Sequence, residues 1–380
     1  MELLLTFFDM YYIMSFVRKL KNLIKLGELY ILSKHREQEF ERHILKDLFW
    51  ECTLSCNASC KHCGSSAEKR KYTEELITNE AKLMFSQIAT DMDASKILIN
   101  VTGGEPLVRH DLCEVMEYAS RLGFHWGMTT NGILLNDENT EKLKKANIET
   151  ISISLDGIGD THDIFRGVAG SYNTIIDNIK KLQEANFLKN LQITTVFNKS
   201  NINEIELLYD TLSNLGIKSW RIGSIDPIGR AEENSDLMLN GTEIKKLFMF
   251  IKKHKRGKMH ITYACQGFLG LAYEKDVRDF YFNCRTGINV ASILYNGDMF
   301  VCPNVLRRPE FIQGNIRTDN FTEIWNNKYK IFRDKERTSC DNCQNCDDWD
   351  YCLGDSFHNW DFEENKPKKC HCELLKEALC

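Results

Sequence analysis

The sequence predicts an α/β fold built on a parallel sheet, followed by a small, loop-rich domain whose core is metal. Between residues 48 and 225, short β-rich runs alternate with stretches whose apolar residues recur every three or four positions. This alternation is typical of parallel strands joined by right-handed helical crossovers. Between residues 282 and 372, long helical patterns are rare, and eight of the chain's 15 cysteines occur there. The first region is therefore expected to form the sheet and the second the metal-stabilised domain.

Six strands and five helices are expected in the sheet region. The strands are expected at residues 48–53, 96–102, 125–130, 150–155, 191–197 and 219–225. The helices between them are expected at residues 79–92, 111–122, 136–146, 171–185 and 202–215. The sheet can be doubly wound or curved like part of a barrel. In both cases ligands bind at the carboxyl ends of the strands, so the residues that follow each strand are the candidates for function.

Two further elements are expected after the sixth strand. One is a helix over residues 241–254, and the other is a hairpin over residues 290–302. Asn296 and Gly297 lie at its turn, and this pair favours a type I′ turn with positive φ at both residues. The expected division of the chain is an N-terminal helical segment at 1–47, the α/β region at 48–235, a helical linker at 236–281 and the cysteine-rich domain at 282–380.

Composition narrows the class of protein. A length of 380 residues suits two domains, or one large domain with an appendage. With 43% apolar and 27% charged residues, the chain has the composition of a globular protein, which excludes disordered and collagenous chains. The net charge of −5 gives no reason to bind nucleic acid. Many cysteines without a cleavable signal peptide favour metal or iron–sulfur ligation in a reducing compartment such as the cytoplasm.

The N-terminal residues raise the question of a membrane segment. The first 17 residues are largely apolar, but Glu2 and Asp9 interrupt them, and a span needs about 20 apolar residues. Residues 3–34 are expected to form an amphipathic helix or helix pair with a basic stripe. We expect it to pack on the main domain; docking on a membrane surface or on a partner is the alternative.

Three cysteines follow the first expected strand. Cys56, Cys60 and Cys63 form a CxxxCxxC motif on one loop, where their thiolates can converge on a single metal centre. A structural zinc site or an ordinary [4Fe–4S] cluster requires four ligands. A cluster held by three cysteines leaves one iron open to another ligand. The alternative is a zinc site completed by His62 or Cys52.

Polar and glycine residues follow the next strands at the same expected edge of the sheet. Glu105 can offer a carboxylate to an ammonium group, and two glycines before it allow close backbone approach. The candidates that follow the second, third and fourth strands are Gly103, Gly104, Glu105, Asn131, Ser154, Asp156 and Arg166.

Together these motifs resemble those of the radical S-adenosylmethionine (SAM) enzymes over residues 48–230. The three cysteines match the family's CxxxCxΦC motif, with His62 in the place of the aromatic residue. The resemblance implies that residues 103–106 receive the methionine amine, that Ser154 touches the ribose or amino-acid portion, and that Arg166 meets the carboxylate. It also implies a partial (β/α)6 TIM-like barrel, a [4Fe–4S] cluster that binds SAM, and hydrogen abstraction by a 5′-deoxyadenosyl radical.

The C-terminal cysteines resemble the SPASM extension of this family, which usually carries two auxiliary clusters. By this resemblance one auxiliary cluster has a complete ligand set, namely Cys343, Cys346, Cys352 and Cys370. The other retains Cys284 and Cys302, because Ser356 stands where the family has a further cysteine. Residues that can replace the missing ligands are Cys340, Cys372, Asp355 and Cys265. One or two auxiliary [4Fe–4S] clusters are therefore expected, with zinc as the alternative.

The resemblance implies a peptide-modifying oxidoreductase of the maturase type, with a peptide or protein substrate and a flavodoxin- or ferredoxin-type electron donor. The alternatives are a small-molecule enzyme, such as one that modifies tetrapyrrole side chains, and a non-catalytic iron–sulfur electron carrier. Asp226, after the sixth strand, and His358 are the catalytic candidates expected to face the substrate.

Overall fold

The computed structural model describes residues 26–334, 338–340, 343, 345–368 and 370–377. It divides the chain into two units, Met1–Ile44 and Leu45–Cys380. In the first unit residues 26–42 form a helix; residues 3–25 of the expected amphipathic pattern lie outside the described residues. None of the described helices combines the length and the apolar character that crossing a membrane requires.

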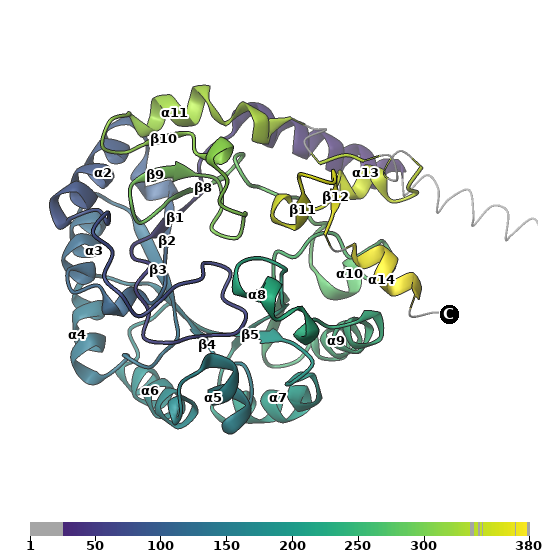
Figure 1. Cartoon of the computed structure of the whole chain (residues 1–380), viewed down its shortest axis with the longest axis horizontal. Coiled ribbons are helices and arrows are strands. Elements are labelled where there is room, and N and C mark those ends of the chain that lie inside the picture. Colours follow the sequence, from purple (N-terminus) through teal and green to yellow (C-terminus); the bar gives the residue numbers. More distant parts are fainter. Residues whose placement is uncertain (1–25, 335–337, 341–342, 344, 369, 378–380) are drawn as a thin grey trace, which may run out of the picture. The chain divides into compact units, whose positions relative to one another are not determined.

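In the second unit, seven parallel strands follow one another across a curved sheet in chain order (Figure 1). They are β1 (Asp47–Glu51), β2 (Leu98–Thr102), β3 (His125–Thr130), β4 (Thr150–Ser154), β5 (Asn190–Phe197), β6 (Ser219–Ser224) and β7 (His260–Tyr263). The first six confirm the expected strands. β7 lies in the segment 236–281, for which the sequence predicts only a helical linker. The outermost strands of the sheet, β7 and β10, do not pair, so this is a partial barrel.

The sheet continues on the other side of β1 into the C-terminal region. β8 (Val290–Ile293) pairs with β1 in parallel, with Val290 opposite Asp47. β9 (Asp298–Phe300) and β10 (Gly314–Asn315) then add antiparallel. The small hairpin of β11 (Trp360–Asp361) and β12 (Lys366–Pro367) is separate from this sheet. The cysteine-rich region is thus hydrogen-bonded into the same sheet as the barrel strands.

Helices cover the outer face of the barrel sheet (Figure 1). They are α2 (Thr78–Asp91), α3 (Leu112–Arg121), α4 (Asp137–Lys145), α5 (Asp160–Arg166), α6 (Ser171–Ala185), α7 (Ile205–Asn214) and α9 (Gly241–His254). The five expected crossover helices and the helix at 241–254 are confirmed. Shorter helices are α8 (Arg230–Glu233), α10 (Glu274–Val277), α11 (Phe321–Asn327), α13 (Trp349–Cys352) and α14 (His371–Glu377). Side chains cap several of them; Asn240 and Glu243 form a capping box at α9.

The two faces of the sheet differ in character because successive side chains of a strand point to opposite faces. On the outer face, Trp50 of β1 packs edge-on against Phe85 of α2, with 5.5 Å between ring centroids. On the inner face, Ser152 of β4 and Thr194 of β5 share a hydrogen bond of 2.7 Å between their hydroxyl oxygens. The core therefore lies between sheet and helices, and the polar inner face borders the space in which a ligand can bind.

The hairpin between β8 and β9 is confirmed, but its type I′ turn is not. Gly297 has a φ of +86°, whereas Asn296 is not among the residues with positive φ. The Gly297 N–H donates to Leu294 O at 2.9 Å, and the Leu294 N–H donates to Asp298 O at 2.9 Å. This longer loop needs only one residue with positive φ, which glycine supplies.

Candidate functional site

The CxxxCxxC loop follows β1 and gathers its three thiols. Cys60 is buried, while Cys56 and Cys63 are half-buried. Burial, with smaller contributions from the nearby Cys60 and Cys63, raises the pKa of Cys56 to about 11. A thiol must lose its proton to bind metal, and the raised pKa of Cys56 makes this loss unfavourable. A strongly binding positive centre therefore has to offset it.

Backbone hydrogen bonds from α5 hold the cysteine loop in place. The N–H of Ser59 donates to Arg166 O at 3.1 Å, and the N–H of Lys61 donates to Phe165 O at 3.2 Å. A Cβ on Gly167, which has a φ of +68°, would lie 2.6 Å from Ser59 Oγ. The end of α5 and the cysteine loop are therefore in direct backbone contact.

A second support comes from Arg230, which the sequence did not single out. Its Nε donates to Cys60 O at 3.0 Å, and its NH1 group donates to Ala67 O at 2.8 Å. The preceding Gly229 packs so closely that a Cβ there would lie 2.4 Å from Gly64 O. The Gly-Arg pair just after Asp226 was the signal available in the sequence.

The polar residues after β2 and β3 form one hydrogen-bonded group. The buried Glu105 carboxylate accepts from Thr130 Oγ1 at 2.7 Å, from the Asn131 N–H at 2.7 Å and from the Leu107 N–H at 3.1 Å. The Asn131 side chain donates to Asn57 Oδ1 in the cysteine loop at 2.7 Å. Three of about four acceptor positions of Glu105 are thus used within the protein, so its expected contact with an amine can use only the remaining one.

Gly103 and Gly104 allow the turn after β2 to lie close to the backbone that follows β1. A Cβ on Gly103 would lie 2.3 Å from Thr53 O, and one on Gly104 would lie 2.3 Å from Ser55 O. Side chains at these positions would push the turn after β2 away from the start of the cysteine loop.

After β4, Asp156 joins three separate segments. Its Oδ2 accepts from Arg166 Nε at 2.5 Å, and its Oδ1 accepts from the Val196 N–H at 2.7 Å. The NH1 group of Arg166 reaches Cys60 Sγ at 3.5 Å. Arg166 thus lies at the cysteines, and its charge is already paired with Asp156. Ser154, buried at the end of β4, completes this group of expected residues.

His62, between two of the cysteines, is half-buried and stacks on Phe165 with 4.4 Å between ring centroids and an interplanar angle of 2°. Burial, and then the charge of Arg166, lower the pKa of His62 to about 3. No hydrogen-bond partner of its Nδ1 occurs in the described part of the chain. A neutral, flat ring therefore occupies the position where the motif has an aromatic residue.

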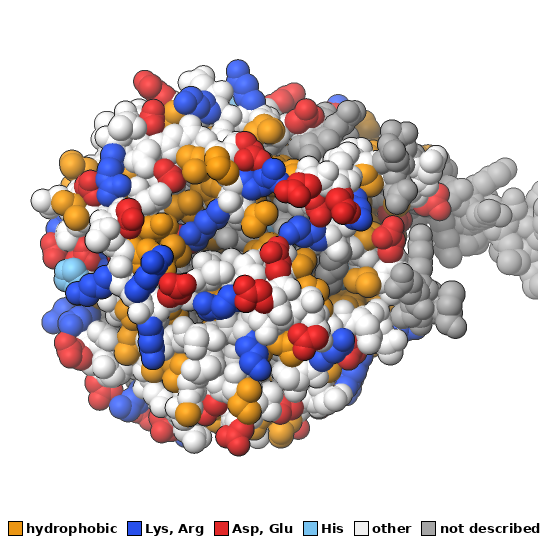
Figure 2. Space-filling view, viewed as in Figure 1, with side chains coloured by type: hydrophobic (Ala, Val, Ile, Leu, Met, Phe, Trp, Pro, Cys, Tyr) orange, Lys and Arg blue, Asp and Glu red, His pale blue; other side chains and the backbone are white. Residues whose placement is uncertain are grey.

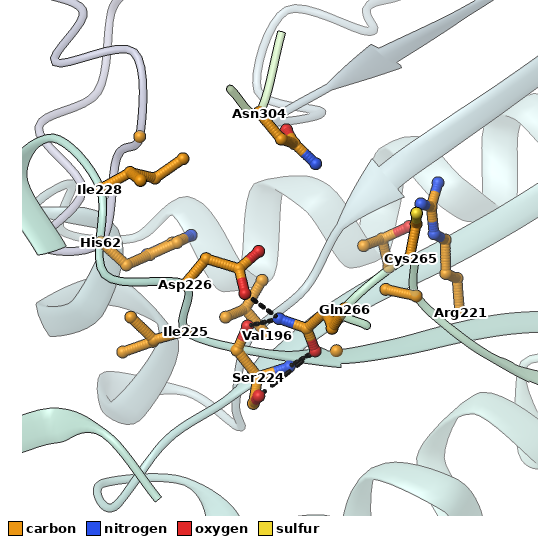
Figure 3. A pocket seen from close by; sticks show the side chains of 14 residues that line it. His62, Val196, Arg221, Ser224, Ile225, Asp226, Ile228, Cys265, Gln266 and Asn304 are labelled. Atoms are coloured by element: carbon orange, nitrogen blue, oxygen red, sulfur yellow. Dashed lines mark hydrogen bonds between the residues drawn. The ribbon is translucent and has the colours of Figure 1, made fainter. Parts of the chain in front are cut away.

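A cavity lies beside this group, between the cysteine loop and the strands β6 and β7 (Figure 3). It has a volume of about 810 Å³, including space open to solvent. His62 and Gly64 line it on the side of the cysteine loop, and Arg221, Asp226 and Cys265 line it on the side of β6 and β7. Because the cavity is open to solvent, a ligand can enter it in part without being fully enclosed.

The two catalytic candidates lie together. His358 Nε2 is 3.6 Å from Asp226 Oδ2, although the two residues come from different regions of the chain. Gln266 Nε2 donates to Asp226 Oδ1 at 2.9 Å (Figure 3). The Asp226 side chain is 18% exposed, on the cavity, and that of His358 is 2% exposed behind it. Asp226 can therefore meet a substrate directly, whereas the buried His358 lies next to Asp226.

The C-terminal cysteines separate into two groups. Cys265 is exposed on the cavity wall. Desolvation by the surrounding protein, followed by the nearby Cys284 and Cys302, raises its pKa. The Phe357 N–H donates to Cys284 Sγ at 3.4 Å, which places the neighbouring Ser356 beside this group. Of the residues expected to complete the set of Cys284 and Cys302, the geometry therefore favours Cys265.

The second group contains Cys340, whose Sγ lies 3.3 Å from that of Cys343. Cys340 thus contacts the set expected to be complete and does not supplement the incomplete one. Cys370 and Asp355 both raise the pKa of Cys352, after burial, so they lie near it. Cys346 is exposed, and the side chain of Cys372 lies outside the described residues.

Within the described segments, no three His, Cys, Asp or Glu side chains are gathered closely enough to hold a single metal ion. Thiols around an iron–sulfur cluster lie farther apart than the ligands of one ion, because the cluster's own atoms stand between them. The donor set, three thiols on one loop beside a paired arginine and a neutral ring, is compatible with a cluster at Cys56, Cys60 and Cys63.

Acidic and basic side chains are intermixed on the face shown in Figure 2. Among the described residues of this face there is no continuous basic area of the kind that binds nucleic acid.

Comparison with known families gives two matches. Residues 50–212 match the Radical SAM superfamily, and residues 284–347 match the SPASM iron–sulfur cluster-binding domain. The first match contains the cysteine loop and the rim residues up to Arg166, and the second contains most of the C-terminal cysteines.

Named relatives are similar to this chain over most of its length. The chain is 30% identical over 323 residues to an AdoMet-dependent heme synthase of Oleidesulfovibrio alaskensis, covering 80% of this chain and 81% of that one. It is 28% identical over 328 residues to the mycofactocin maturase MftC of Mycobacterium tuberculosis, covering 83% and 80%.

Solved structures agree in fold. Streptococcus suis SuiB bound to S-adenosylmethionine has a TM-score of 0.69 at 17% identity, covering 90% of this chain and 81% of that chain. The protein anSMEcpe with bound AdoMet and the Cp18Cys peptide has a TM-score of 0.67 at 17% identity, covering 88% and 95%.

Proposed function

Since this chain belongs to the radical SAM superfamily and carries a SPASM iron–sulfur domain, we propose that it abstracts hydrogen from a substrate bound in the cavity between its cysteine loop and β6. Membership implies a [4Fe–4S] cluster, SAM and auxiliary iron–sulfur clusters. The observation that carries the proposal is the meeting of the cysteine loop, the Asp156–Arg166 pair and the cavity at one edge of the sheet.

In this proposal Cys56, Cys60 and Cys63 hold the cluster that binds SAM. When bound, that cluster supplies the electron that splits SAM into methionine and a 5′-deoxyadenosyl radical. Arg166 contributes positive charge beside Cys60, where an anionic carboxylate has to bind. The neutral ring of His62 offers a flat, uncharged surface on the cavity side of the loop.

Asp226 is the proton acceptor in this proposal, because it is the carboxylate that lines the cavity. His358 and Gln266 orient it from behind. After the 5′-deoxyadenosyl radical has taken a hydrogen atom, further oxidation of the substrate radical releases a proton and an electron. A positioned carboxylate can take the proton, and an auxiliary iron–sulfur cluster, when bound, would take the electron.

We propose a peptide or protein substrate. The similarity to the MftC maturases over 83% of the chain supports it, as does the opening of the cavity to solvent, which lets part of a large substrate enter. A tetrapyrrole substrate is the second candidate, favoured by the similarity to heme synthases at 30% identity. Because the cavity is open to solvent, part of either substrate can enter it.

A small acidic electron donor of the flavodoxin or ferredoxin type is the expected partner. Lys61 in the cysteine loop is exposed, and so is the run Lys69–Lys71 that follows the loop. These cations support docking of an acidic protein next to the cluster, since opposite charges steer such encounters.

The proposed reaction is tested with anaerobically reconstituted protein, SAM and dithionite. The wild type should release 5′-deoxyadenosine, and Cys56→Ala should abolish the release and lower the iron content by about four per chain. Cys113→Ala, on α3, is the matched control and should retain both. No release by the wild type, or equal release by Cys56→Ala, would instead favour an electron carrier.

A further inference from the structure

Arg221 projects from the middle of β6 into the cavity (Figure 3). Its neighbours in the strand, Trp220 and Ile222, are fully buried on the opposite face, whereas Arg221 is exposed. Across the sheet it lies between Thr194 of β5 and Thr262 of β7, which carry no charge. The strand therefore places one guanidinium on an otherwise neutral part of the barrel's inner face.

The guanidinium of Arg221 has no hydrogen-bond or ion-pair partner among the described residues. No carboxylate forms an ion pair with it, and no hydrogen bond engages it, anywhere in the described part of the chain. Other arginines near the cavity are all engaged. Arg166 pairs with Asp156, Arg278 pairs with Glu274, and Arg230 donates to backbone carbonyls. Arg221 is the exception among these four.

Thiols lie near Arg221. Its charge lowers the pKa of Cys265 and of Cys302, although burial dominates at both. A guanidinium presents five N–H donors in a planar fork, and a neighbouring thiol engages few of them. Most of its donors therefore point into a cavity that a ligand can enter.

We propose that Arg221 receives a carboxylate of the substrate and so fixes which end of the substrate lies at the β6 wall. This inference rests on the proposed function and specifies the substrate class as a carboxylic acid. The guanidinium fork matches a carboxylate in a bidentate geometry, which a lysine would not reproduce. Asp226 lines the same cavity. Arg221 would therefore hold the carboxylate of the substrate at one point, while the substrate group that loses a proton faces Asp226.

The carboxylate can come from a peptide or from a propionate of a tetrapyrrole. Both present the same chemistry to Arg221, so the test first asks whether a carboxylate binds there and then which source binds better.

The test uses phenylglyoxal, which modifies unpaired arginines, on the anaerobically reconstituted full-length protein with SAM. Mass spectrometry of the digest measures the modification rate of each arginine. Propionate should slow modification of Arg221 at least tenfold, and propionamide should not. Arg256, exposed on the loop after α9, is the internal reference and should react equally in both.

Two results would overturn the inference. One is a rate at Arg221 that propionate and propionamide leave unchanged. The other is an Arg221 that stays unmodified without any ligand while Arg256 reacts, because the guanidinium would then be engaged within the protein, for example by the thiol group of Cys265, Cys284 and Cys302.

Two matched pairs of compounds identify the source of the carboxylate. Coproporphyrin III is compared with its tetramethyl ester, and a peptide with a free C-terminus is compared with its amide. The acid that protects Arg221 at the lower concentration identifies the source, and Arg221→Met should weaken its binding at least tenfold, with a smaller loss for Arg221→Lys. Protection by propionate alone supports the inference and indicates a different acid.

Failure of this inference is distinct from failure of the proposed function. Release of 5′-deoxyadenosine by the wild type tests the function, and protection of Arg221 tests only the substrate contact. Each can be obtained without the other.

Discussion

The two sides of the cavity are built differently. On one side is the rim, whose residues His62 and Gly64 line the cavity. The rim consists of the cysteine loop together with Glu105, Asn131, Asp156 and Arg166, which lie beside the cavity. On the other is the wall, formed by Arg221, Asp226 and Cys265. At the rim the charged groups are paired or hydrogen-bonded within the protein. At the wall, Arg221 has no partner in the described residues and Asp226 is partly exposed.

This difference matches two kinds of ligand. A bound group that is the same in every turnover benefits from side chains fixed in advance, since no free energy is then lost in ordering them. A substrate that must enter and leave requires groups whose hydrogen bonds are still available. The rim therefore has the character of a cofactor site and the wall that of a substrate site.

The largest expected effect is at the rim, where Asp156→Asn breaks a buried ion pair. Arg166 would keep its charge without a carboxylate partner, so the free energy of unfolding should fall by about 3 kcal/mol or more. Urea unfolding measures it. Glu138→Gln removes the surface pair with Lys142 and should cause little or no change. An equal effect of the two substitutions would contradict the view that the rim is held by its buried pair.

At the wall, Asp226→Asn should lower the rate at which substrate is converted to product. The amide can still accept the hydrogen bond from Gln266 but cannot accept a proton, so product formation should fall about 100-fold. The ratio of product to 5′-deoxyadenosine measures this. Asp236→Asn, an exposed Asp ten residues later in the chain, is the control and should leave the ratio as in the wild type. If Asp226→Asn also left it unchanged, the proton acceptor would have to be another group.

The smallest expected effect is a pH dependence at the rim. His162 Nδ1 accepts from the Asp156 N–H at 3.0 Å, and burial lowers the pKa of His162 to about 4, partly offset by Asp156. The unfolded chain binds a proton near pH 6.5 and the folded one only near pH 4. The contribution of neutral His162 to the free energy of unfolding is therefore complete above pH 6.5 and is lost as the pH falls towards 4.

The matched variant is His162→Asn, which keeps an acceptor near the position of Nδ1 and does not titrate. Between pH 7 and pH 5 the wild type should lose about 2 kcal/mol of unfolding free energy relative to this variant. Urea unfolding at the two pH values measures the difference. Parallel pH dependence in both proteins would show that His162 does not supply it.

The sequence predicted the repetitive parts of the fold well. Six strands and the helices between them follow from apolar periodicity, which reports local burial. β7 was missed because its four residues, HITY, are too short for a pattern. The pairing of β8 with β1 could not be predicted either, because the alternation of apolar residues in a strand does not identify a partner distant in the chain.

The site was predictable where chemistry is concentrated in motifs. The cysteine loop and the residues after β2 to β4 were found because cysteine, glycine and charge recur there at fixed spacings. Arg230 acts on backbone carbonyls, and such contacts leave no pattern in side-chain types. Cys265 was left as a weak candidate because only folding brings it near Cys284 and Cys302.

The parallel pairing of β8 with β1 also constrains the order of folding. β1 leads directly into the cysteine loop, yet one of its two neighbouring strands begins at Val290. During synthesis β1 remains an edge strand until most of the chain has emerged, and contacts between such distant segments form slowly. We therefore expect the cysteine loop to reach its final geometry late, so that cluster insertion follows completion of the chain rather than accompanying its N-terminal half. Pulse-labelling hydrogen exchange of the refolding chain, with β1 amides protected no earlier than those of β8, would be the signature of this order.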